Sequence, residues 1–148
     1  MCFALYAGTE KAIPEQKWNK DAPDLFVQAL SERDAKIKDH FTKSEVQYIG
    51  STSGCGCDFP HVSLQNGSWP VFDDDEEDPE WEAKDKYNRE SLVTLIRKLG
   101  EESIELYGVW DGDFSEIPKI RETISVQTIL DPSFLFKEQG FYTVAVNK

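Results

Sequence analysis

The first stretch of the chain, Cys2–Ala7, is apolar at every position. In a strand, successive side chains point to opposite faces of the sheet, so both faces of this stretch would be apolar. A strand of that kind is buried on both sides, and we therefore expect it at the centre of a sheet. Gly8 ends the run. The first constraint on the fold is thus a sheet built around the N-terminal strand.

Further runs of alternating apolar and polar residues predict more strands. The expected ranges are Leu25–Leu30, Glu45–Ser51, Ser103–Trp110, Arg121–Leu130 and Phe141–Val146. The pair Asn66-Gly67 is a strong turn signal between alternating segments, and it predicts a hairpin with arms His61–Gln65 and Ser68–Phe72. Pro70 would restrict the second arm to a sheet edge.

Two helices are expected in addition to the strands. The longer one is indicated by an apolar stripe at helical spacing, formed by Leu92, Leu95, Ile96 and Leu99. Asn88 is expected to cap its start, and Gly100 is expected to end it. The shorter helix is expected to follow Ser31 as its cap and to run towards Phe41.

These elements predict a single α+β domain over residues 1–148. The sheet should be largely antiparallel or mixed, with five to seven strands, and the two helices should pack on one face. The length of 148 residues suits one domain, and 9 Phe, 5 Tyr and 4 Trp supply bulky side chains for its core.

The negative charge of the chain is concentrated in the segment Asp73–Glu82. This segment holds eight of the 28 acidic residues and no basic residue, so the rest of the chain has a net charge of −4 out of a total of −12. Because it also contains Pro79, we expect a solvated acidic loop. As a functional alternative, the segment could dock a basic protein partner with Trp81 as its anchor.

Several function classes are disfavoured by the sequence. Lys and Arg do not cluster as nucleic-acid binding requires, so no nucleic-acid partner is expected. No segment approaches the roughly 20 apolar residues that span a bilayer, and the start does not resemble a signal peptide. The 3 cysteines do not form the even-numbered pattern of a secreted disulfide framework. We therefore expect a cytoplasmic protein that does not associate with membranes.

The residue types of a metal site occur in the glycine-rich loop between Gly50 and His61. Cys55, Cys57 and His61 form the pattern C-x-C-x3-H, and thiolate sulfur and imidazole nitrogen are ligands that Zn²⁺ prefers. Cys2 could complete the set if the first and third predicted strands are neighbours. Zinc sites more often have about two to four residues between paired cysteines, so a plain glycine-rich turn beside a buried Cys2 stays open as an alternative.

The same loop also has the residue types of a thiol-dependent enzyme. Cys55 or Cys57 could act as nucleophile with His61 and Asp58, provided that the fold brings them together. Three hypotheses therefore stand: a zinc-binding protein in a structural or sensing role, an acidic interaction module that acts as inhibitor or adaptor, and a thiol enzyme. The sequence favours a binding protein over an enzyme and does not predict an oligomeric state.

Overall fold

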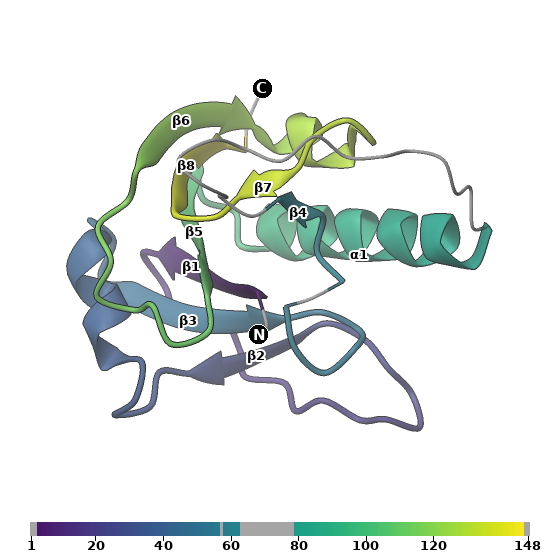
Figure 1. Cartoon of the computed structure of the whole chain (residues 1–148), viewed down its shortest axis with the longest axis horizontal. Coiled ribbons are helices and arrows are strands. Elements are labelled where there is room, and N and C mark those ends of the chain that lie inside the picture. The colour runs from purple at the N-terminus through teal and green to yellow at the C-terminus, as the bar shows by residue number, and fades with distance from the viewer. Residues whose placement is uncertain (1–2, 57, 63–78, 147–148) are drawn as a thin grey trace.

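The computed structural model describes residues 3–56, 58–62 and 79–146, and its main sheet is built around the N-terminal strand (Figure 1). Strand β1 (Phe3–Thr9) pairs antiparallel with β3 (Glu45–Gly50) on one side and with β5 (Ser103–Trp110) on the other. All 7 of its residues are buried. This confirms the expectation that a run apolar on both faces becomes a central strand.

Three further strands complete a six-stranded mixed sheet in the order β2-β3-β1-β5-β8-β6. β2 (Phe26–Ala29) forms one edge, and β6 (Ile120–Ser125) forms the other, parallel to β8 (Gly140–Ala145). A second, two-stranded sheet joins β4 (His61–Val62) in parallel to β7 (Phe136–Lys137). The α+β class and the mixed sheet are as predicted, whereas the parallel β4–β7 pair was not expected.

The helices lie on both faces of the sheet. The long helix α1 (Pro79–Lys98) packs Leu92, Val93 and Ile96 into one core, which also contains residues of η2 (Val126–Leu130). The 3-10 helix η1 (Ala35–His40) is the predicted short helix, and it places Ile37 in a second core on the opposite face of β1. The predicted pair of helices on one face is therefore found only in part.

Helix α1 begins earlier than the apolar stripe indicates. Its first residue is Pro79, so Asn88 lies inside the helix and does not cap it. Proline suits the first helical position, and Glu80 and Glu82 in the first turn interact favourably with the helix dipole. The last residues of the acidic segment are thus helical, whereas residues 73–78 lie outside the described ranges and their docking of a basic partner stays a prediction. Gly100 follows the helix with φ +68°, as expected of a C-terminal stop.

Two other predicted boundaries were wrong. Asp34, not Ser31, occupies the cap position of η1, and its carboxylate accepts hydrogen bonds from the backbone and hydroxyl of Ser31. The strand predicted to reach Leu130 ends at Ser125, whose hydroxyl accepts a hydrogen bond from the Gln127 amide and caps η2. The predicted hairpin turn at Asn66-Gly67 lies outside the described residues.

A buried arginine connects α1 to the segment around η2. The side chain of Arg89 is 3% exposed and donates to Asp85 Oδ2 at 2.7 Å. Its guanidinium also donates to the carbonyls of Ile129 at 3.0 Å and Asp131 at 2.6 Å. Removal of this side chain would leave a carboxylate and carbonyl oxygens without their donor in the interior, which is costly.

We expect Arg89→Met to lower the free energy of unfolding by about 3 kcal/mol, because it breaks a buried ion pair from one side. Lys86→Met is the matched control, since Lys86 is 76% exposed and 3.8 Å from Glu90 on the same helix. The control should cost no more than about 0.5 kcal/mol. Urea denaturation of both variants measures this difference, and equal losses would contradict the structural role given to Arg89.

Candidate functional site

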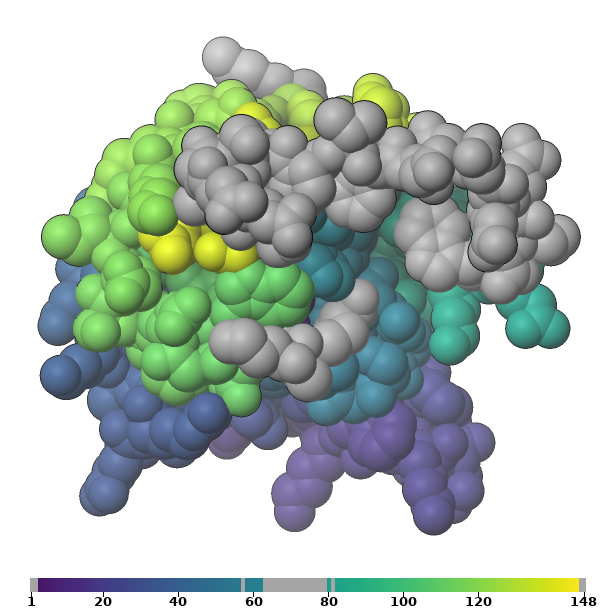
Figure 2. All heavy atoms as spheres, in the orientation of Figure 1, coloured from purple at the N-terminus to yellow at the C-terminus, as the bar shows by residue number. Residues whose placement is uncertain are grey.

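The glycine-rich loop folds onto the start of β1. A Cβ atom added to Gly56 would lie 2.3 Å from the carbonyl oxygen of Phe3, so only glycine permits this close approach. In Figure 2 the loop forms part of the visible face, between the green residues that follow β5 and the purple N-terminal residues. The loop therefore lies against the residue that follows Cys2 in the sequence, whereas Cys2 itself is outside the described residues.

Hydrogen bonds inside the loop hold it as a compact turn. The backbone amide of Ser51 donates to the Cys55 carbonyl at 2.6 Å, and the amide of Gly54, which has φ +90°, donates to the Ser51 carbonyl at 3.2 Å. The Asp58 amide donates to the Ser51 hydroxyl, and the Asp58 carboxylate accepts from the hydroxyl of Thr52, each at 3.2 Å. Asp58 thus stabilises the loop through its hydrogen bonds to Ser51 and Thr52.

Asn88 of α1 and Trp18 fix the loop to the rest of the protein. The completely buried Asn88 side chain accepts from the Thr52 amide at 3.1 Å and donates to the Thr52 hydroxyl at 3.1 Å. It also donates to the Lys84 carbonyl within the helix at 2.8 Å. The indole of Trp18 donates to the Thr52 carbonyl at 3.1 Å. Asn88, which was predicted to cap the helix, therefore connects α1 to the loop through its hydrogen bonds with Thr52.

The ring of His61 is held in a defined position and tautomer. Its Nδ1 lies 2.6 Å from the carbonyl oxygen of Phe59, which requires a proton on Nδ1. The ring stacks on Phe3 with centroids 4.5 Å apart and an interplanar angle of 4°, and it meets Trp110 edge-on at 5.7 Å. Nε2 has no hydrogen-bond partner among the described residues. Metal-binding histidines commonly show this arrangement, with one ring nitrogen donating to a carbonyl and the other bound to the metal.

Cys55 is half-buried. Its sulfur lies 3.5 Å from the Ser53 hydroxyl, and the residue lines a cavity next to β1. Among the described residues, the hydrogen bond and ring contacts of His61 are with Phe59, Phe3 and Trp110. The predicted pairing of the Cys55 thiol with His61 in a thiol enzyme stays a prediction.

Of the predicted metal ligands Cys2, Cys55, Cys57 and His61, the structure describes Cys55 and His61. Within the described ranges, no group of three or more His, Cys, Asp and Glu side chains is arranged to hold a metal ion. A complete set would require the sulfurs of Cys2 and Cys57, which lie outside those ranges.

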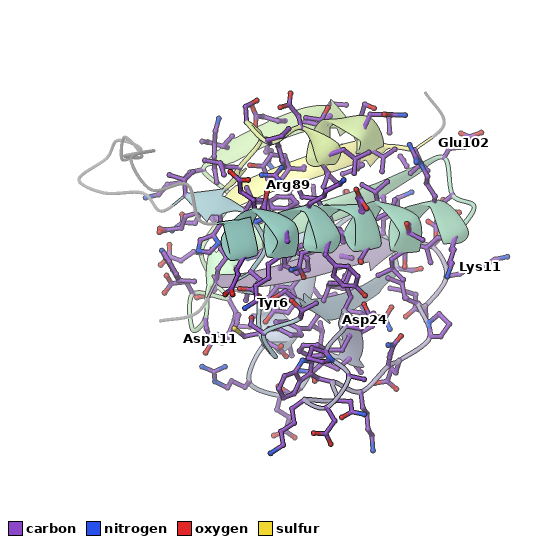
Figure 3. The ribbon with its side chains drawn as sticks, turned by 90° about the vertical axis from the view of Figure 1, so that its right-hand side faces the viewer. Tyr6, Lys11, Asp24, Arg89, Glu102 and Asp111 are labelled. Atoms are coloured by element: carbon purple, nitrogen blue, oxygen red, sulfur yellow. The ribbon has the colours of Figure 1, made fainter. Side chains whose placement is uncertain are left out.

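The cavity beside Cys55 contains residues that sequence reasoning missed. It has a volume of about 300 Å³ and is lined by Tyr6, Arg33, Asp34 and Asp111 among others. Figure 3 labels Tyr6 and Asp111, which lie in the same part of the molecule, below α1 in that view. The Tyr6 hydroxyl donates to Asp34 Oδ2 at 3.0 Å. Because these residues come from separate parts of the chain, no local motif could have indicated them.

Burial and the neighbouring Asp34 carboxylate raise the pKa of Tyr6 well above its usual range. Tyr6 therefore remains a protonated hydrogen-bond donor at neutral pH.

Comparison with known proteins gives no independent indication of function. No protein-family model, no curated protein and no solved structure matches this chain. In the part of the chain that the structure describes, no helix has the length and apolar character needed to cross a membrane.

We expect Asn88→Ala to lower the free energy of unfolding by about 2 kcal/mol, since it leaves buried partners at Thr52 and Lys84 unpaired. Amide hydrogen exchange at Thr52 should also become faster, because its acceptor is lost. Asn19→Ala is the control: Asn19 is exposed and accepts one hydrogen bond from the Asp21 amide. If both variants leave exchange at Thr52 unchanged, Asn88 does not anchor the loop.

Proposed function

We propose that the protein binds zinc, in a structural or sensing role, where the glycine-rich loop meets the start of β1. His61 supplies the nitrogen ligand, and Cys2, Cys55 and Cys57 are the candidate sulfur ligands. The observation that carries this proposal is the hydrogen bond between His61 Nδ1 and the Phe59 carbonyl. It holds a proton on Nδ1 and leaves Nε2 as the nitrogen that can bind a metal.

The position of Phe3 supports the choice of sulfur ligands. Gly56 packs against the Phe3 carbonyl, and His61 stacks on the Phe3 ring. Gly56 and His61, from the two parts of the C-x-C-x3-H motif, therefore both contact Phe3, the residue that follows Cys2 in the chain. Cys57 is likewise bonded to Gly56. We therefore expect Cys2 and Cys57 to bind the metal together with His61, and Cys55 to be the fourth ligand.

A site with four protein ligands favours a structural or sensing role over a catalytic one. Catalytic zinc keeps one coordination position open for water or substrate, whereas structural zinc is fully enclosed by protein ligands. Zinc bound here would tie the N-terminal strand to a loop that is already anchored on α1 through Asn88. Loss of the zinc, or oxidation of the cysteine thiolates that bind it, would remove this connection between the strand and the loop. This is the basis for a sensing role.

We expect purified protein under reducing conditions to bind about one zinc per chain. His61→Ala should weaken binding by at least about tenfold, measured by competition with a chromophoric chelator. His40→Ala is the matched control, because His40 lies on η1 with Nε2 3.0 Å from the Phe114 carbonyl. Binding should also weaken as the pH falls, since protons compete with zinc for thiolate and imidazole.

The cysteine variants test the rest of the ligand set. Cys2→Ser and Cys57→Ser should each weaken zinc binding, because serine does not provide a thiolate. A metal content below about 0.2 per chain that Cys57→Ser leaves unchanged would contradict the proposal, since such a site should bind zinc firmly. Equal effects of His61→Ala and His40→Ala would contradict it as well.

A further inference from the structure

We propose that the cavity beside β1 is a binding site for a small organic cation, such as a primary amine or a methylated ammonium group. The cavity lies between the first three strands of the sheet order, the turn before η1 and the turn after β5. Its volume of about 300 Å³ is at the lower end of the range for ligand pockets, about 300–1,000 Å³, so it suits a small ligand.

Aromatic rings from three neighbouring strands line the cavity. Tyr6 comes from β1, Phe26 from β2 and Tyr48 from β3. The centroids of Tyr6 and Tyr48 are 5.5 Å apart, and those of Phe26 and Tyr48 are 5.8 Å apart. Aromatic faces attract ammonium groups, and they do so more strongly when the cation leaves water. The walls of the cavity are therefore chemically suited to a positive ligand.

Asp34 adds a buried negative charge to these aromatic walls. The residue is 8% exposed, and its carboxylate accepts hydrogen bonds from the Tyr6 hydroxyl at 3.0 Å and the Ser31 amide at 2.6 Å. The Ser31 hydroxyl donates to the same carboxylate at 3.1 Å. Each of these donors leaves the negative charge in place, because none of them is itself a cation.

The remaining charged residues of the lining cancel each other. Arg33 donates two hydrogen bonds to the carboxylate of Asp111, at 2.8 and 3.1 Å, and its guanidinium lies 5.1 Å from the centre of the Phe114 ring. The lining therefore has a net charge of −1, which comes from Asp34. An anionic ligand would meet Asp34 and would have to separate Arg33 from Asp111. The charge balance thus favours a cation.

Titration with choline and with n-butylammonium, followed by NMR shifts of backbone amides, tests the proposal. Either cation should shift the amides of Tyr6, Asp34 and Tyr48 in a saturable way. The uncharged carbon analogue of choline, 3,3-dimethylbutan-1-ol, should bind roughly tenfold more weakly, because it lacks the charge that the rings and Asp34 attract. Acetate should produce no saturable shifts at these residues.

Asp34→Asn removes the charge but keeps an oxygen that can accept from Ser31, and it should weaken cation binding by roughly tenfold. Asp39→Asn is the matched control, since Asp39 is exposed on the same 3-10 helix and does not line the cavity. Tyr48→Leu is a second test if Asp34→Asn does not fold, and it should also weaken binding. The proposal is overturned if neither cation binds, or if the neutral analogue or acetate binds as tightly as the cations. It is also overturned if Asp39→Asn weakens cation binding as much as Asp34→Asn does.

Discussion

Burial of β1 on both faces is the constraint on which the other elements depend. Phe3, Leu5 and Ala7 lie in the core beneath α1, whereas Ala4 and Tyr6 lie in the core that contains η1. A shift of one residue in the pairing with β3 or β5 would exchange the two sets of side chains between the two cores. The register of the sheet, and with it the position of everything that packs on β1, is therefore strongly specified.

Both proposed sites follow from that placement. Phe3 receives the loop and the His61 ring at the start of the strand, and Tyr6 reaches Asp34 from the other face. The proposed zinc site has the imidazole nitrogen of His61 and cysteines that lie close to it in the sequence. The proposed cation site has aromatic rings and the carboxylate of Asp34. The chemistry differs because the two faces of one strand present different side chains, although the same backbone positions both.

The sequence predicts best what depends on local periodicity. β5 was predicted over its full range. Gly100 was predicted as the residue that ends α1, because a glycine can adopt the positive φ of a helix end without any contact to a distant residue. The start of α1 and the end of β6 were missed because caps and dipole effects outweigh the alternation there. The contact of Asn88 with Thr52 and the contact of Tyr6 with Asp34 join residues 36 and 28 positions apart, and no local pattern encodes such pairs.

The coordination of bound zinc tests the central claim most directly. X-ray absorption at the zinc edge of the loaded, reduced protein should show sulfur ligands at about 2.3 Å together with nitrogen at about 2.0–2.1 Å. In the His61→Ala variant the imidazole contribution should disappear while sulfur remains. A spectrum of the unmodified protein with oxygen and nitrogen ligands but without sulfur would contradict the account, because it would place the metal away from the cysteines of the loop.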